Sequence, residues 1–244
     1  MTRLHLQSLQ FTDSRWRDDL YPFQLPAVRH VKENGLKFTT PITFFVGENG
    51  TGKTTILEAI AARYPRIGSY SPYTRRTGTE LSYEDVPLAW NADLKLSSNS
   101  TTEGFFLRAS SLGSLIGDLD RESKPSPRAT ERPLSRRSHG EGLLGLLNTY
   151  FDAPGMYFLD EPETALSFKA TLGVVGLLFS LGQHGSQIVA ATHSPVLLSM
   201  PGASILEFGD FGIREVAKDD LELFRDWQSF LERPETWLRH LLET

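Results

Sequence analysis

Apolar residues recur along the chain in the two spacings that are typical of buried strands and of helices. Short apolar runs, and one stretch near the start that alternates apolar with polar residues, predict strands at 4–9, 42–46, 105–108, 156–159 and 187–191. Apolar residues at helical spacing predict helices at 54–63, 142–150 and 164–181. Strands that alternate with helices favour a mainly parallel sheet covered on both faces. The pattern therefore predicts an α/β fold.

The remaining segments give less regular patterns. Residues 13–30 are aromatic-rich and irregular, and residues 64–104 carry many Pro, Gly, Ser, Thr and Tyr residues, which predicts loops and short strands. Residues 204–208 and 212–216 predict a pair of strands. The C-terminal helical segment, at about 219–243, predicts two amphipathic helices broken at Pro234. We expect its apolar face to pack on the core rather than to recruit a partner.

Length and composition fit one domain over residues 1–244. Hydrophobic residues make up 39% and charged residues 23%, as is ordinary for a soluble globular protein. The absence of cysteine excludes disulfides, thiol catalysis and cysteine-bound metals. The N-terminus lacks the apolar core of a signal peptide, and the longest apolar segment, 172–181, is too short to span a membrane. We expect a soluble, cytoplasmic protein.

Charge is unevenly distributed along the chain. The net charge of −5 gives no support to constitutive nucleic-acid binding. Residues 121–138, however, are low in apolar residues, rich in proline and locally basic, which predicts a flexible loop. Such a segment could contact DNA or RNA phosphates. A solvated loop is the interpretation that we favour.

A glycine-rich segment after the strand at 42–46 is the most specific chemical signal. It fits the pattern G-x-x-x-x-G-K-[ST] and consists of Gly47, Glu48, Asn49, Gly50, Thr51, Gly52, Lys53, Thr54 and Thr55. A strand that feeds such a turn into a helix N-terminus directs backbone N–H groups at phosphate oxygens. Lys53 would reach the β- and γ-phosphates, and the Thr54 hydroxyl would hold Mg²⁺. The segment therefore predicts a nucleoside triphosphate site.

Two acids follow the apolar strand at 156–159. Asp160 at the end of that strand is the predicted Mg²⁺ ligand beside Thr54. Glu161 is then placed to polarise the attacking water. The alternative is an acidic cap on the helix expected from Thr164.

Further motifs carry a resemblance to ABC-type ATPases. Residues 160–167 resemble their Walker B motif and D-loop, 190–195 their switch histidine, and 138–142 their signature motif. The resemblance implies ATP and Mg²⁺ as ligands, and a P-loop NTPase sheet flanked by helices with an N-terminal antiparallel β element. It also implies that His193 senses the γ-phosphate. Ser138, Gly140 and Glu141 would contact the γ-phosphate bound by a second copy, which implies an ATP-driven homodimer. A simple capping box over Ser138 and Glu141 is the alternative.

The chain departs from the ABC pattern in three places. The D-loop ends in Ser167, where transporters mostly have Asp. Residues 106–111 lack the glutamine that the family usually carries there, so either Ser110 or Ser111 substitutes through water or coupling works differently. No aromatic residue precedes the P-loop strand in the transporter manner. Trp16, Tyr21 and Phe23 are candidates for stacking on adenine, although core packing is the role that we favour for each.

Within the family, the chain resembles small stand-alone bacterial ATPases of the chromosome-maintenance and defence group. Those chains also carry a Tyr-Pro-Phe segment, as at 21–23, and a Leu-Arg-His-Leu segment, as at 238–241. The short spacing from Lys53 to Ser138 excludes a long coiled-coil arm. The expected function is ATP hydrolysis linked to nucleic-acid maintenance or defence, with a nucleic-acid or protein partner. The alternative is the motor subunit of a membrane transporter, although we expect a membrane partner less.

Overall fold

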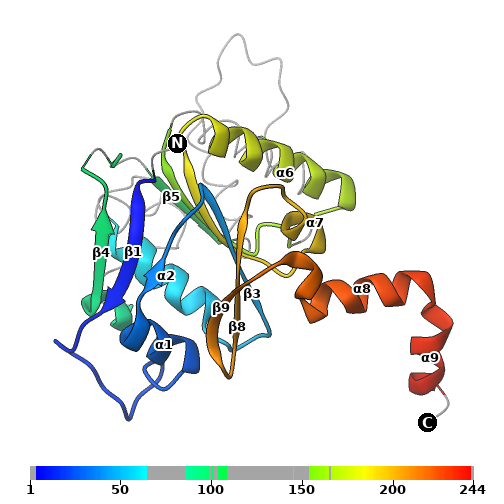
Figure 1. Ribbon diagram of the computed structural model, residues 1–244, viewed down its shortest axis with the longest axis horizontal. Coiled ribbons are helices and arrows are strands. Elements are labelled where there is room, and N and C mark those ends of the chain that lie inside the picture. The colour runs from blue at the N-terminus through cyan, green and yellow to red at the C-terminus, as the bar shows by residue number, and fades with distance from the viewer. Residues whose placement is uncertain are drawn as a thin grey trace, which may run out of the picture.

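A six-stranded sheet forms the centre of the structure, which is a computed structural model (Figure 1). The structure describes residues 4–64, 86–98, 100, 101, 104–108, 145, 154–164 and 166–242. The strand order within this part of the chain is β5-β6-β7-β3-β8-β9. These strands are β3 (Ile42–Gly47), β5 (Gly104–Arg108), β6 (Met156–Asp160), β7 (Gln187–Ala191), β8 (Ser204–Gly209) and β9 (Gly212–Val216). All neighbours pair in parallel except β8 and β9, which confirms the predicted mainly parallel sheet and the predicted strand pair.

Two helices cover opposite faces of this sheet. Helix α2 (Lys53–Arg63) shares one apolar cluster with Phe45, and helix α6 (Phe168–Gln183) shares the other with Phe44. Because successive side chains of a strand point to opposite faces, β3 supplies both clusters. Its residues from Ile42 to Val46 are all buried, without alternation, as expected of a strand covered on both sides. A short helix, α7 (Pro195–Leu198), packs beside α6.

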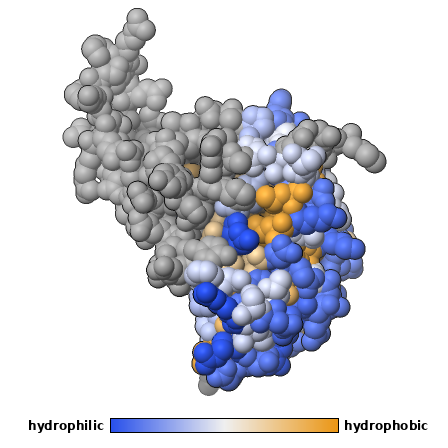
Figure 2. Space-filling model, turned by 90° about the vertical axis from the view of Figure 1, so that its left-hand side faces the viewer, coloured by the Kyte–Doolittle hydropathy of each residue, from blue (hydrophilic) through white to orange (hydrophobic). Residues whose placement is uncertain are grey.

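The predicted N-terminal antiparallel element is confirmed. A separate sheet has the order β2-β1-β4, formed by β1 (Leu6–Phe11), β2 (Leu36–Lys37) and β4 (Ala92–Leu96). The 3₁₀ helix η1 (Pro87–Trp90) precedes β4. In the view onto the side where β1 and β4 lie, the described surface is mostly hydrophilic with one small apolar patch (Figure 2). The start of β1 lies next to the start of β7, and β4 packs against α2.

One buried glutamine joins the two sheets. The Oε1 atom of Gln187 accepts hydrogen bonds from the backbone N–H groups of His5, at 2.7 Å, and Leu6, at 2.8 Å. Its Nε2 group donates to the Leu6 carbonyl at 2.9 Å. Gln187 is 1% exposed, so these backbone groups have no access to water as a substitute partner. The amide therefore fixes the start of β1 against the start of β7.

Two predicted boundaries are wrong. Residues 26–30 are not irregular, because helix α1 (Pro26–Asn34) begins at Pro26 and buries Ala27, Val28 and Val31. Proline suits the first helical position, where its missing N–H would have no helical partner. The helix expected from Thr164 begins instead at Phe168, where the Ser167 hydroxyl caps it by accepting from the Ala170 N–H. Residues 161–164 form a bend and a turn before it.

The C-terminal helices depart most from the expectation. After the 3₁₀ helix η4 (Lys218–Asp220) come α8 (Glu222–Glu232) and α9 (Pro234–Leu242), which confirms the break at Pro234. Leu221 is buried, and Phe224 packs against the core, but α8 has no buried residue. Trp227 and Leu231 are exposed, and the two helices extend away from the sheet (Figure 1). The prediction that this segment packs on the core is wrong for most of its length.

Other expectations fall on residues that lie outside the described part of the chain. These are the flexible loop at 121–138 and, apart from Gly145, the helix at 142–150. Within the described residues, no helix is long and apolar enough to cross a membrane.

Replacing Gln187 by Ala tests the joint between the sheets. The change leaves two buried donors and one buried acceptor without partners, so we expect a loss of about 3 kcal/mol in the free energy of unfolding. Urea denaturation measures it. The control is Gln183→Ala at the exposed end of α6, with an expected effect within about 0.5 kcal/mol. Equal effects of the two substitutions would contradict the assignment.

Candidate nucleotide site

The predicted phosphate loop connects β3 directly to α2. Its glycines adopt the left-handed backbone region, with φ values of 144° at Gly47, 84° at Gly50 and 101° at Gly52. At Gly47 the constraint is also steric, because a Cβ atom there would lie 2.3 Å from the Phe208 carbonyl oxygen of β8. Residues 48–50 are exposed, and the Thr51 hydroxyl closes the turn by donating to the Glu48 carbonyl. The loop therefore has the shape that its sequence predicts.

Lys53 begins the helix after the loop and folds back over it. Its Nζ atom donates to the Gly47 carbonyl at 2.7 Å and to the Glu48 carbonyl at 2.8 Å. Burial lowers the pKa of Lys53, while the negative charges of Glu161, Asp160 and Glu48 oppose that shift. These contacts hold the ammonium group at the loop, where a phosphate chain would meet it.

The predicted metal pair is brought together. The Thr54 hydroxyl donates to Oδ1 of Asp160 at 2.8 Å, and Asp160 is 6% exposed at the end of β6. Burial raises the pKa of Asp160, and the Thr54 hydrogen bond and the Arg108 charge oppose the shift. A hydroxyl and a carboxylate oxygen in contact fit Mg²⁺, which binds proteins through few oxygen ligands and keeps phosphate oxygens and waters for the rest.

Arg108 is a site residue that the sequence did not reveal. It ends β5 in register with Asp160 on the neighbouring strand. Its Nε atom lies 3.5 Å from Oδ2 of Asp160, and its Nη2 atom contacts the Glu58 carboxylate of α2. Its place at the carboxyl end of a predicted strand was the available signal. The expected substitutes for the missing glutamine, Ser110 and Ser111, lie outside the described residues.

The two predicted groups at the γ-phosphate position also meet. Glu161 has a φ of 51°, and its N–H donates to the Ala191 carbonyl at the end of β7. Oε1 of Glu161 lies 3.8 Å from Nε2 of His193. Burial lowers the pKa of His193, and the charge of Lys53 lowers it further, against Glu161, Glu163 and Asp160. The imidazole is therefore mostly neutral at pH 7.

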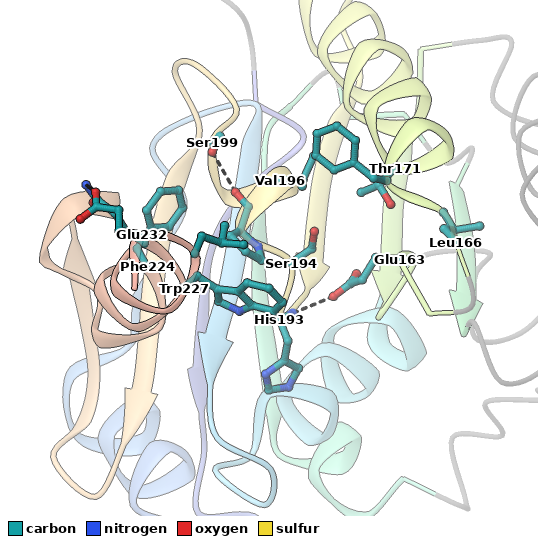
Figure 3. Close-up of a pocket in the computed structure, with 14 residues that line it drawn as sticks. Glu163, Leu166, Thr171, His193, Ser194, Val196, Ser199, Phe224, Trp227 and Glu232 are labelled. Atoms are coloured by element: carbon teal, nitrogen blue, oxygen red, sulfur yellow. Dashed lines mark hydrogen bonds between the residues drawn. The ribbon is translucent and has the colours of Figure 1, made fainter. Parts of the chain in front are cut away.

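Glu163 is a second residue that the sequence did not reveal. Its Oε1 atom accepts from the Thr192 hydroxyl and from the His193 backbone N–H, each at 2.7 Å. In Figure 3 its carboxylate points at the main chain of His193. The acid directly after Asp-Glu-Pro was the available signal, but the contact spans 29 and 30 residues of sequence.

The aromatic candidates for adenine have different surroundings. Phe23 is buried, and Trp16 packs against Phe23 with ring centroids 4.9 Å apart, which confirms their core role. Tyr21 is 72% exposed, and its hydroxyl lies 3.4 Å from Oγ1 of Thr55. The prediction that Tyr21 packs in the core is wrong. The signature residues Ser138, Gly140 and Glu141 lie outside the described part of the chain.

Comparisons with known proteins agree with this geometry. A family described as "AAA domain" matches residues 27–64, from α1 to the end of α2. A second family, described as "AAA domain, putative AbiEii toxin, Type IV TA system", matches residues 108–199, from Arg108 past His193.

Curated relatives are similar at low identity. The cytochrome c biogenesis ATP-binding export protein CcmA of Paracoccus denitrificans is 27% identical over 173 residues, which cover 70% of this chain and 78% of that protein. The ABC multidrug transporter SNQ2 of Candida glabrata is 24% identical over 239 residues, which cover 81% of this chain. This chain spans only 15% of the length of SNQ2.

A solved structure shares the fold. It is described as "An inward-facing conformation of a putative metal-chelate type ABC transporter", and it matches with a TM-score of 0.52 and 15% identity. The likeness covers 90% of this chain and 85% of that one. The fold, the loop geometry and the matches together support an ABC-type P-loop ATPase.

Replacing Gly47 by Ala tests the close contact between the loop and β8. The added Cβ has no room beside the Phe208 carbonyl, and φ at this position disfavours side chains, so we expect unfolding to become easier by about 3 kcal/mol. Urea denaturation without nucleotide measures this. The control is Gly176→Ala in α6, where a Cβ meets nothing within 4 Å. A Gly47→Ala protein as stable as the control would show that the contact does not constrain the loop.

Proposed function

We propose that this chain binds ATP with Mg²⁺ and hydrolyses its β–γ phosphoanhydride bond. The observation that carries the proposal is the meeting of two pairs at one sheet edge: Thr54 with Asp160 at 2.8 Å, and Glu161 with His193 at 3.8 Å. Both pairs lie next to Lys53, at carboxyl ends of parallel strands, where open α/β sheets bind ligands.

Each residue has a distinct task in this proposal. The backbone of residues 47–55 and the Lys53 ammonium bind the phosphates, and Thr54 and Asp160 hold the metal. Mg²⁺, when bound, supplies neutralisation of charge on the β- and γ-phosphate oxygens. Glu161 orients the attacking water and accepts its proton, because its carboxylate is partly exposed and lies 3.8 Å from His193. The neutral His193 hydrogen-bonds the γ-phosphate.

The proposed working unit is a homodimer that forms on ATP. Ser138, Gly140 and Glu141 of one copy would complete the γ-phosphate site of the other, as the resemblance to ABC-type ATPases implies. The proposed setting is a soluble, cytoplasmic role in nucleic-acid maintenance or defence, with a nucleic-acid or protein partner. The family match whose description names a toxin of a type IV system supports the defence side.

A second candidate function is the motor subunit of a membrane transporter. The relatives that are named as export and multidrug transporters favour it. The two candidates differ in what stimulates turnover: a membrane protein for the motor, or a nucleic acid or soluble protein for the first candidate.

Replacing Glu161 by Gln tests the hydrolytic role. The amide cannot accept a proton from water, so we expect phosphate release to fall at least about 100-fold while ATP affinity is kept. Phosphate release with ATP and Mg²⁺ and binding of a fluorescent ATP analogue measure the two effects. Lys53→Ala should lose binding, and Glu215→Gln on β9 is the control with unchanged turnover. A Glu161→Gln protein that turns over like the wild type would contradict the assignment.

The same Glu161→Gln protein tests the dimer. Because it holds ATP without turning it over, it should shift from monomer to dimer when ATP and Mg²⁺ are added, as measured by size-exclusion chromatography with light scattering. Ser138→Arg in this background should bind ATP and stay monomeric. ATP binding without any change in mass would refute the proposed role of residues 138–141 in trans.

A further inference from the structure

Glu163 connects two segments that carry different parts of the hydrolysis site. It lies in the turns after β6, two residues beyond Glu161, and its side chain reaches the segment after β7. A single oxygen, Oε1, accepts both the Thr192 hydroxyl and the His193 backbone N–H at 2.7 Å. Because both donors belong to consecutive residues, the carboxylate fixes the direction of the main chain immediately before the His193 side chain.

The receiving segment is rigid on its other side as well. Thr192 is fully buried, and its N–H donates to the Phe45 carbonyl of β3 at 3.0 Å. Its hydroxyl, while donating to Glu163, also accepts the Ser194 N–H at 3.0 Å. His193 is therefore held between two anchored neighbours. Without Glu163, the Thr192 hydroxyl and the His193 N–H would both lack an acceptor among the described residues.

Hydrogen bonds also connect the turn that contains Glu163 to Glu161. The Glu161 N–H donates to the Ala191 carbonyl at 2.9 Å, and the Thr164 N–H donates to the Glu161 carbonyl at 3.0 Å. The Thr164 hydroxyl lies 3.5 Å from Oε2 of Glu161. A movement of Glu163 would therefore displace the Glu161 main chain together with the His193 main chain.

The second carboxylate oxygen of Glu163 distinguishes the hydrogen bonds that this residue accepts from the effect of its negative charge. Oε2 of Glu163 is buried and has no hydrogen-bond partner among the described residues. Glu163 lines an apolar groove of about 910 Å³ between α6, α7 and α8, with Leu166 and Trp227 on its walls (Figure 3). A glutamine would offer an acceptor oxygen to the same two donors. The carboxylate adds a negative charge next to His193, in surroundings that screen it poorly.

We propose that Glu163 is a positioning residue of the hydrolysis site, which locks Glu161 and His193 into one unit through the Thr192 and His193 hydrogen bonds. The inference rests on the proposed ATP hydrolysis. Glu163 itself touches no reacting atom in this account. Its loss should therefore reduce turnover and leave nucleotide binding, which depends on residues 47–55, nearly unchanged.

Three variants test the proposal. Glu163→Ala removes both hydrogen bonds and the charge. Glu163→Gln keeps the acceptor oxygen and removes the charge. Glu215→Ala is the control. Glu215 also accepts a hydroxyl hydrogen bond between neighbouring strands, from Ser204 at 2.6 Å, but on β9 away from the proposed water. We expect phosphate release to fall about 100-fold in Glu163→Ala, the size of loss typical of displaced catalytic groups. Phosphate release by Glu163→Gln should stay within about tenfold of the wild type, because the two hydrogen bonds are retained.

Two measurements without nucleotide keep this test independent of turnover. Native-state amide exchange at His193 should accelerate at least about tenfold in Glu163→Ala and stay slow in Glu163→Gln. In an NMR titration, the pKa of His193 should fall in Glu163→Gln, since the Glu163 charge raises it. Glu215→Ala should change neither.

The outcomes separate the two proposals. Wild-type protein that binds ATP without releasing phosphate would refute the hydrolytic function, and the exchange data would still show whether Glu163 holds His193. Turnover of Glu163→Ala within about threefold of a hydrolysing wild type would overturn the positioning role. Equal turnover losses in Glu163→Ala and Glu163→Gln, with His193 protection kept in Glu163→Gln, would also overturn it, because loss of the two hydrogen bonds would then not be the cause.

Discussion

The hydrogen bond from Thr54 to Asp160 is the contact on which the geometry of the nucleotide site depends. Thr54 follows β3, Asp160 ends β6, and β7 lies between these two strands in the sheet. The bond therefore spans the end of β7 and depends on the register of all three strands. In this register Phe45, two residues before the end of β3, is level with Ala191, and Ala191 is level with Asp160. The same alignment brings Lys53, Glu161 and His193 to one edge.

This edge of the sheet carries several ionisable side chains in partly buried positions, where burial disfavours their charged forms. Burial acts on Lys53, Asp160 and His193, and each shift is in the direction that favours the neutral form. Mutual attraction between Lys53 and the acids offsets part of that cost. Such arrangements are weak sources of stability, since apolar residues of equal volume often do as well. Lys53, Asp160 and His193 lie beside the phosphate loop, whose glycines have positive φ values. This position is consistent with a site that binds a charged ligand.

The sequence could predict the parts of the site that consist of residues adjacent in the chain. The phosphate loop needs glycines at fixed positions, and Asp160 directly ends an apolar strand, so neighbouring residues alone were sufficient. Arg108, Glu163 and Tyr21 act through contacts with distant segments, which no local spacing encodes. The α1 helix was missed because the aromatic residues before Pro26 hid its short apolar pattern. The C-terminal helices have a clear apolar face, but a pattern cannot show whether the chain's own core covers it.

The late start of α6 explains how the two halves of the hydrolysis site meet. A helix that began at Thr164 would leave only residues 161–163 to connect it to β6, and Glu161 among them has a φ of 51°. Instead the helix begins after its Ser167 cap, and residues 161–164 form a bend and a turn next to the end of β7. Those turns let Glu161 reach the Ala191 carbonyl and Glu163 reach His193. The position of one helix cap thus decides whether two acids close in sequence can act on a histidine about 30 residues away.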